Sequence, residues 1–241
     1  MPDPVVQSTD VEYTVEGTTM VGRLALPAAD GLRPAVLIAH DGGGLDEYQK
    51  ARAERFAELG YVAFAMDYYG HGRSVTDDDA AARCLALWSE PERIRESATA
   101  ALDLLRTQPQ VDTERVGAVG YCFGGAFALE LARAGADVKA VVGFHPRLAT
   151  RRPADAANVR GAVLVCVGAD DPLISVEERI AFEEQMRAGG ADWQLHLYGG
   201  VKHSFTRPGV ERTRGPDNEY NERADRRSWR AMLELFDAAF G

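Results

Sequence analysis

The chain has 241 residues, 46% of them hydrophobic, and a formal net charge of −10 at pH 7. This length allows one or two domains with a sizeable buried core. The acidic balance argues against nucleic acid or an anionic membrane surface as a partner, because both repel a negatively charged protein.

The cysteines and the N-terminal segment indicate in which cellular compartment the protein is expected. Cys84, Cys122 and Cys166 are too few and too widely spaced for a zinc ribbon or a disulfide framework. The opening residues MPDPVVQSTDVEY contain neither the basic region nor the apolar run of a signal peptide. No stretch approaches the roughly 18 apolar residues of a membrane span. We therefore expect a cytoplasmic protein in a reducing compartment, where a reactive thiol persists.

The first predicted elements form a hairpin. Residues 11–15 and 20–26 have the composition of strands, and the Gly17-Thr18-Thr19 segment between them predicts a turn. An unbroken apolar run then covers residues 35–39. Such runs are typical of parallel strands that are buried on both faces of a sheet.

Helices and strands alternate along the rest of the chain. The predicted helices cover 48–59, 77–88, 92–106, 124–134, 176–188 and 219–240, and the predicted strands 61–66, 116–120, 140–144, 162–167 and 193–197. This order predicts an α/β fold, a doubly wound and mostly parallel sheet preceded by an antiparallel hairpin. No repeat or long linker divides the sequence, so we expect residues 1–241 to form a single domain. Residues 207–218, rich in Arg, Gly and Pro, are predicted to be a surface loop.

The strongest chemical signal lies between Gly120 and Gly124, where a predicted strand turns into a predicted helix with Cys122 at the apex. This is the G-x-nucleophile-x-G elbow of α/β-hydrolases, with cysteine in the usual place of serine. Such a turn strains the backbone of the nucleophile, and the close approach of strand and helix requires glycine on either side. The helix N-terminus also favours a thiolate. A phosphate-binding glycine turn is a poor alternative, because the G-x-G-x-x-G spacing is missing. The other two cysteines, Cys84 and Cys166, are interpreted as small buried hydrophobic residues.

Three histidines follow Cys122 and could serve as its base: His145, His196 and His203. In α/β-hydrolases the acid and then the histidine come after the nucleophile in the chain. His203 fits this order and lies in a glycine-containing loop after the last predicted strand, where sites form in open α/β sheets. His196 falls inside a predicted strand, and His145 precedes every candidate acid.

The acid is expected at the end of the strand before His203. There the sequence is Gly168-Ala-Asp-Asp-Pro172, and Asp171 is the preferred carboxylate, with Asp170 as the alternative. An Asp before Pro alone would indicate only a turn. Together with the elbow and the histidine loop, it predicts a triad of Cys122, His203 and Asp171.

A second glycine-rich segment, from His40 to Gly44, follows the first predicted parallel strand. In this fold one oxyanion amide follows the nucleophile and the other belongs to this loop, so the candidates are Phe123 and Gly42. A flexible turn is the alternative for the loop. Asp41 is interpreted either as a salt-bridged surface acid or as a carboxylate that contacts Cys122 and influences its ionisation.

These motifs resemble the dienelactone hydrolase family over most of the chain from about residue 11. The resemblance is carried by residues 38–44 (IAHDGGG), 60–69 (GYVAFAMDYY), 120–125 (GYCFGG), 203–207 (HSFTR) and the single position 171. Members of the family cleave enol lactones, and relatives cleave other esters. The resemblance implies that Cys122, Asp171 and His203 are catalytic.

Three details of the resemblance concern the substrate. Asp41 stands where the family has a glutamate, and Arg207 matches an arginine that holds a substrate carboxylate. A second carboxylate-binding arginine of the family has no clear counterpart, since Trp88 fits but Ala81 occupies the aligned position and Arg83 is only nearby. One arginine binds a carboxylate more weakly than two.

The expected function is hydrolysis of an ester or lactone bond in a small, carboxylate-bearing substrate through an acyl-enzyme. No metal or organic cofactor is expected, and the chain is expected to be a monomer or weak homodimer. Two alternatives stay open: a general carboxylesterase or thioesterase of the same fold, and a non-catalytic ligand-binding protein that retains the fold.

Overall fold

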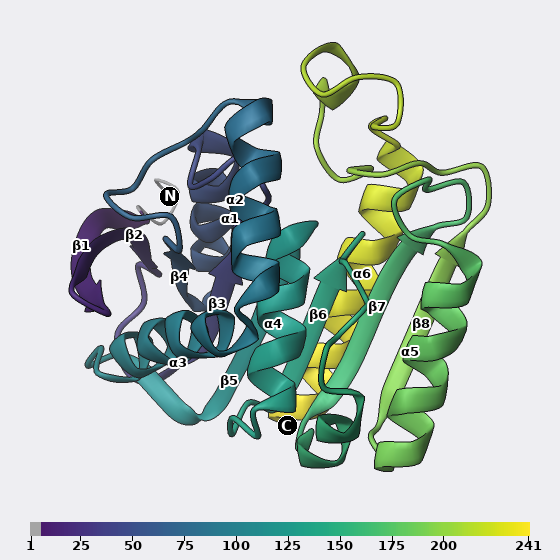
Figure 1. Cartoon of the computed structure of the whole chain (residues 1–241). Helices are drawn as coiled ribbons and strands as arrows, with labels where there is room; N and C mark the ends of the chain where they lie inside the picture. Colours follow the sequence, from purple (N-terminus) through teal and green to yellow (C-terminus); the bar gives the residue numbers. More distant parts are fainter. Residues whose placement is uncertain (1–5) are drawn as a thin grey trace.

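Eight strands form one sheet in the computed structural model, which describes residues 6–241 (Figure 1). The strands are β1 (Gln7–Val15), β2 (Thr18–Leu26), β3 (Arg33–Ala39), β4 (Val62–Met66), β5 (Val111–Tyr121), β6 (Ala140–Phe144), β7 (Ala162–Gly168) and β8 (Trp193–Tyr198). Their spatial order is β1-β2-β4-β3-β5-β6-β7-β8. Strands β1 and β2 form an antiparallel hairpin, and β2 pairs with β4 in antiparallel orientation. The other neighbouring pairs, from β4 through β3 and β5 to β8, are parallel. This confirms the predicted fold class.

The helices cover both faces of this sheet. They are α1 (Glu47–Glu58), α2 (Asp77–Ser89), α3 (Pro91–Arg106), α4 (Phe123–Arg133), α5 (Val176–Gly189) and α6 (Glu222–Phe240), with short 3-10 helices η1 (Pro153–Asn158) and η2 (Val210–Arg212). Within residues 6–241, no helix has both the length and the apolar character needed to cross a bilayer.

Local capping explains where several helices begin. The side chains of Asp46, Ser175 and Asn221 accept hydrogen bonds from the first-turn amides of α1, α5 and α6. The prediction that the last helix begins at residue 219 was wrong for this reason. The amide of Glu219 instead donates to the carbonyl of His203, 3.0 Å away, so the helix starts only after the Asn221 cap.

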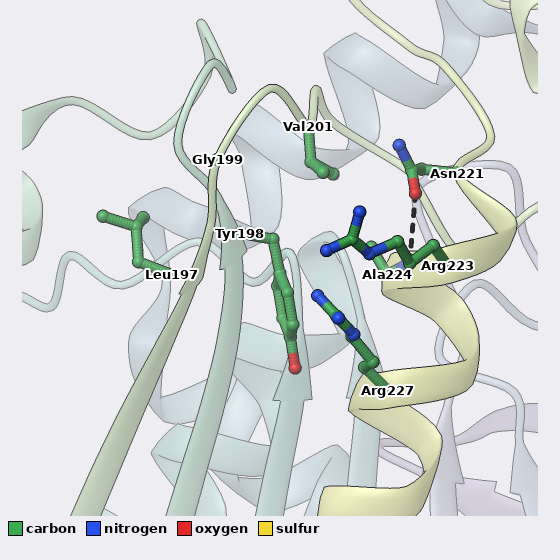
Figure 2. A pocket seen from close by; sticks show the side chains of 8 residues that line it. All are labelled: Leu197, Tyr198, Gly199, Val201, Asn221, Arg223, Ala224 and Arg227. Atoms are coloured by element: carbon green, nitrogen blue, oxygen red, sulfur yellow. Dashed lines mark hydrogen bonds between the residues drawn. The ribbon is translucent and has the colours of Figure 1, made fainter.

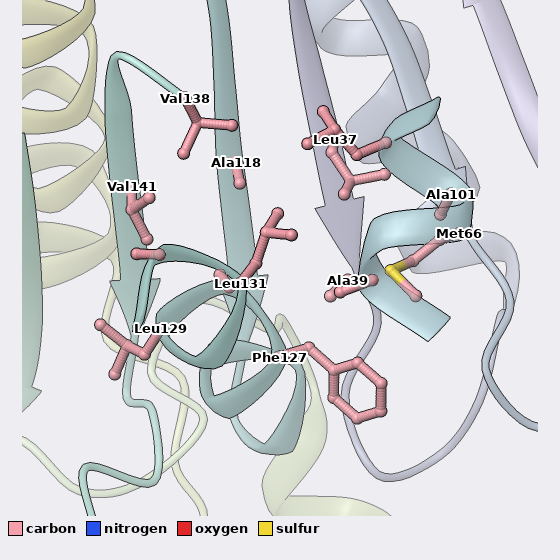
Figure 3. Close-up of a cluster of buried hydrophobic side chains, with 14 of the residues drawn as sticks. Leu37, Ala39, Met66, Ala101, Ala118, Phe127, Leu129, Leu131, Val138 and Val141 are labelled. Carbon is pink, nitrogen blue, oxygen red and sulfur yellow. The ribbon is translucent and has the colours of Figure 1, made fainter. Parts of the chain in front are cut away.

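Two apolar cores separate the layers. On one face, α3, α4 and α5 pack on the sheet, and Figure 3 shows Phe127 and Leu131 of α4 beside Leu37 and Ala118 of the strands. On the other face, α1 and α6 pack through buried aromatic side chains such as Phe56. Strands β3, β4, β6 and β7 are buried almost throughout, as expected for parallel strands covered on both faces.

The turn between β5 and α4 is the tightest crossing in the fold. Cys122 stands between the two elements with φ 52° and ψ −117°, a conformation that residues with a side chain rarely adopt. A Cβ atom on Gly120 would lie 2.0 Å from the carbonyl oxygen of Gly124, and one on Gly124 would lie 2.2 Å from that of His40. The strained turn at Cys122 and the two glycines that leave no room for a side chain are therefore as the sequence predicted.

This crossing predicts a severe effect of one methyl group. Gly120→Ala should prevent folding or lower the free energy of unfolding by more than about 3 kcal/mol, because backbone atoms would have to move. Gly199→Ala is the matched control, since nothing lies within 4 Å of its Cβ position, and it should cost less than about 1 kcal/mol. Urea denaturation followed by circular dichroism measures both. A Gly120→Ala protein as stable as the parent would contradict this description of the elbow.

Candidate active site

The structure brings Cys122, Asp171 and His203 together at the carboxyl ends of β5, β7 and β8. The His203 ring nitrogen Nδ1 lies 2.7 Å from Oδ2 of Asp171, and Nε2 lies 3.1 Å from Sγ of Cys122. Asp171 is buried, and its Oδ1 accepts from the amide of Leu173 at 2.9 Å. Asp170, the alternative acid, is exposed. The three side chains form one hydrogen-bonded line with the thiol at its outer end.

Backbone contacts fix the histidine from both sides. The His203 amide donates to the carbonyl of Asp217 at 3.2 Å, and its carbonyl accepts from the amide of Glu219. Burial lowers the pKa of His203, but the charge of Cys122 and the hydrogen bond to Asp171 outweigh it and raise this pKa to about 10. The arrangement therefore favours an imidazolium beside the sulfur at neutral pH.

The other two candidate histidines occupy different places. His145 is buried, and its Nε2 lies 3.0 Å from the hydroxyl oxygen of Thr206. Its ring centre is 4.9 Å from that of His203. Burial, reinforced by the charge of His203, holds the pKa of His145 well below its usual 6.5. His196 lies on β8, opposite Cys166 of β7.

The two candidate oxyanion amides are held in place by their surroundings. Phe123 is the first residue of α4, and the first amides of a helix have no acceptor within it. The peptide that carries the Gly42 amide is fixed through its other end, because the Asp41 carbonyl lies 2.7 Å from the His40 ring and 3.2 Å from the hydroxyl of Tyr68. Both N–H groups are thus available for a developing negative charge.

Asp41 is a buried acid clamped by two arginines. Its Oδ1 accepts from Arg214 at 2.9 Å and from the amide of Gly43 at 2.7 Å, and its Oδ2 accepts from Arg207 at 3.1 Å. Burial would raise the pKa of Asp41, but the two guanidinium groups hold it below its usual value. Of the two interpretations, the salt-bridged acid describes these partners, although the side chain is buried rather than on the surface. Its hydrogen bonds within the described chain are to these groups and not to Cys122.

The prediction of a plain surface loop at residues 207–218 needs correction. Arg207 and Arg214 turn inward toward Asp41, and Val210 is buried in the short helix η2. The physical reason is that a buried carboxylate requires cationic partners. The composition of the segment shows that it is polar, but it does not show that its arginines pair with the buried Asp41.

A cavity of about 230 Å³ opens at the thiol. It is lined by Cys84, Cys122, Phe123, Arg147, Leu173, Ile174 and His203. Sequence reasoning missed Arg147, Leu173 and Ile174, although each follows the end of a parallel strand, where such a site was expected. The sequence analysis also interpreted Cys84 as a purely structural residue, whereas Cys84 lines this cavity and its Sγ lies 3.3 Å from the hydroxyl oxygen of Tyr69.

None of the residues predicted to bind substrate (Asp41, Arg83, Trp88 and Arg207) is among the residues that line this cavity. Arg207 donates to Asp41 and also to Asp46, so its nitrogens are already engaged. Arg83 lies over the ring of Tyr69, with its guanidinium carbon 5.3 Å from the ring centre. Trp88 has the guanidinium of Arg147 over its ring at 4.2 Å.

A separate hollow of about 240 Å³ lies between β8 and the start of α6, and Figure 2 shows Arg223 and Arg227 reaching into it beside Tyr198. None of its eight lining residues is a cysteine, a histidine or a carboxylate. It is therefore not the candidate active site. Among the side chains that the structure describes, no three from His, Cys, Asp or Glu gather in a way that could hold a metal ion.

A mixed sheet with a nucleophile elbow after β5 defines the α/β-hydrolase class. The profile of the dienelactone hydrolase family matches residues 20–240, and the chain belongs to that family. A solved structure named m3DLH is 40% identical, covers 98% of this chain and 99% of its own, and superposes with a TM-score of 0.95. A dienelactone hydrolase-like promiscuous phosphotriesterase from metagenomic libraries is 38% identical, with coverage of 98% and 99% and a TM-score of 0.95. Carboxymethylenebutenolidase of Pseudomonas putida is 26% identical over 193 residues, which are 77% of this chain and 80% of that protein.

The Asp41 clamp predicts a change in thiol reactivity. Asp41→Asn would remove a negative charge that lies beside Arg207 and Arg214 near Cys122, and the more positive field that remains favours the thiolate. The rate of alkylation by iodoacetamide should therefore reach its pH midpoint at a lower pH than in the parent protein. Arg214→Gln removes a cation that interacts with Cys122 and should move the midpoint upward. Three superimposable pH profiles would show that the clamp has no influence on the thiol.

The buried His145 predicts a loss of stability in mild acid. The folded protein keeps this ring neutral, whereas the unfolded chain binds a proton below about pH 6.5. The free energy of unfolding should therefore fall as the pH drops below about 6.5, by up to about 1.4 kcal/mol per pH unit for this group. His203 opposes part of this fall between about pH 7 and pH 6, because its raised pKa keeps the folded ring protonated while the unfolded chain is still taking up its proton.

Urea denaturation at about pH 7 and about pH 5.5 measures that slope, in a range above the titration of most carboxylates. His145→Gln should flatten it in part, because the pKa of buried His40 is also lowered and contributes in the same direction. An unchanged slope in the variant would mean that His145 does not titrate in this way.

Proposed function

We propose that this protein hydrolyses the ester or lactone bond of a small substrate, with Cys122 as the nucleophile and an acyl-enzyme as the intermediate. The observation that carries the proposal is the contact of the Cys122 sulfur with His203, which in turn contacts Asp171. Membership of the dienelactone hydrolase family supports it. The proposed roles are nucleophile for Cys122, proton carrier for His203 and orienting acid for Asp171.

In the proposed first step, the Cys122 thiolate attacks the carbonyl carbon of the substrate. The amides of Phe123 and Gly42 donate hydrogen bonds to the oxyanion, and such donors act most strongly where water is excluded. The tetrahedral intermediate then collapses, the C–O bond to the alcohol breaks, and protonated His203 gives its proton to the leaving oxygen. In a lactone this oxygen stays tethered to the acyl group.

The second half returns the thiolate. Neutral His203 takes a proton from a water molecule, which attacks the thioester carbon, and the carbon–sulfur bond breaks with Cys122 as the leaving group. The carboxylic acid product leaves, and His203 again carries the proton beside the thiolate. Asp171 keeps Nδ1 of the ring protonated throughout, so that Nε2 faces the reacting atoms.

A substrate carboxylate at Arg207 belongs to the proposal on the strength of the family resemblance. Such a carboxylate would have to replace Asp41 or Asp46, because both already accept hydrogen bonds from that guanidinium. General carboxylesterase or thioesterase activity needs no such replacement. A panel of lactones, aryl esters and acyl thioesters, assayed with the same preparation, separates these substrate classes.

Phosphotriester hydrolysis is a second candidate. The similar structure from metagenomic libraries is named a promiscuous phosphotriesterase, and the cavity here has an apolar wall of Phe123, Leu173 and Ile174 that suits neutral aryl groups. A thiolate with two oxyanion amides can attack a phosphorus centre as well as a carbonyl carbon. A neutral aryl phosphotriester is therefore included in the same panel.

The nucleophile assignment predicts a selective loss of activity. Cys122→Ala should lower kcat/KM for 4-nitrophenyl acetate by at least about 1,000-fold, because the covalent route is removed. Cys166→Ala is the matched control, since Cys166 is fully buried in β7 away from the cavity, and should keep most of the activity. Cys84→Ala tests the other cavity thiol, which burial keeps neutral by raising its pKa to about 11.

Circular dichroism must show that all three variants fold. Turnover by Cys122→Ala at near the parent rate would rule out the proposed mechanism. A loss confined to Cys84→Ala would instead transfer the nucleophile role to Cys84.

A further inference from the structure

The cations around the cavity differ in what they already bind. Arg207 is paired with Asp41 and Asp46, and Arg214 is paired with Asp41. Arg147 has no ion pair within the part of the chain that the structure describes, and it is the arginine among the residues that line the cavity. A charged group on a substrate would therefore meet Arg147 without first displacing a carboxylate.

Two contacts fix the position of Arg147. It follows β6 after His145 and the buried Pro146, and its amide donates to the carbonyl of Cys122 at 3.4 Å. Its guanidinium lies over the ring of Trp88, 4.2 Å from the ring centre. Stacking uses the flat face of a guanidinium and leaves the N–H groups on its edge free for a carboxylate.

An apolar surface accompanies this cation in the cavity. Phe123, Leu173 and Ile174 line it together with the thiol, and the side chain of Leu173 is 55% exposed. A large apolar residue exposed in a cavity is typical of a ligand-binding surface. The cavity thus combines a nucleophile, an apolar wall and an unpaired cation.

We propose that Arg147, stacked on Trp88, is the anion subsite of this pocket. It binds the carboxylate of a substrate in which an apolar segment separates that carboxylate from the carbonyl attacked by Cys122. The substrate class is a monoester of an aliphatic dicarboxylic acid rather than a compact carboxylated lactone. This inference rests on the proposed ester hydrolysis, and it assigns the anion to Arg147 instead of Arg207.

The test compares charged and neutral substrates of equal length. The charged series comprises 4-nitrophenyl monoesters of adipate, pimelate and suberate, whose chains are too long for rapid attack by their own carboxylate. In the neutral series the free carboxylate is capped as a methyl ester. The measured quantity is kcat/KM for each charged ester divided by that for its neutral partner, which removes effects common to both.

The parent protein should prefer the charged ester about tenfold or more for at least one chain length, as a charge-assisted contact would give. Arg147→Met keeps an apolar side chain on Trp88 but removes the charge, and the ratio should fall to about one. Arg147→Lys should retain part of the preference for the charged ester. Lysine carries the positive charge but lacks the planar guanidinium group that donates two hydrogen bonds to one carboxylate.

Two further variants serve as comparisons. Arg151→Met is the matched control, because Arg151 donates to the carbonyl of Trp88 at 3.2 Å but does not line the cavity, and its ratio should stay at the parent value. Arg207→Met tests the alternative assignment, and its ratio should also stay near the parent value.

A parent protein without preference for the charged esters overturns the inference. So does a preference that survives Arg147→Met but disappears in Arg207→Met. The neutral esters report the proposed function separately. If the parent protein cleaves neither series, the proposed hydrolysis is wrong and the inference falls with it, whereas loss of the ratio alone leaves the hydrolysis intact.

Discussion

The crossing of β5 and α4 constrains everything around the thiol. Because Gly120 and Gly124 have no side chains, the helix approaches the strand within backbone contact, and Cys122 is left in a positive-φ conformation at the apex. The strain has a structural use, since it presents the sulfur at the sheet edge and aims the first amides of α4 at the same space. The loop after β3 is tied to this crossing as well, through the contact of Gly124 with His40.

Charge is distributed around that crossing in two buried groups. One is the line from Cys122 through His203 to Asp171, in which the raised pKa of His203 favours a protonated ring. The other comprises Asp41 and Asp46 with Arg207 and Arg214, in which two carboxylates balance two guanidinium groups close to the first group. In the account proposed above, this cancellation leaves the triad to set its own protonation state.

The sequence predicted the features that depend on local spacing. A G-x-C-x-G turn after an apolar run specifies the elbow, and the order of strands places Asp171 and His203 at the same sheet edge. The sequence did not predict the contacts that long side chains make. Arg214 meets an acid 173 positions earlier in the chain, and Arg147, in the segment after β6, stacks on Trp88 of helix α2. Such pairs depend on tertiary packing and side-chain rotamers, which no local pattern encodes. The start of α6 was misplaced for a related reason, because the residues before it pair with the His203 backbone.

The central claim is that the substrate's acyl group passes through a covalent bond to Cys122. Its most direct test is acid quenching of the protein during turnover of an aryl ester, followed by intact mass measurement and peptide mapping. We expect a mass increase equal to the acyl group, located on the peptide that contains Cys122 and absent from Cys122→Ala. Steady turnover with no adduct at any time, or with the acyl group on another residue, would contradict it.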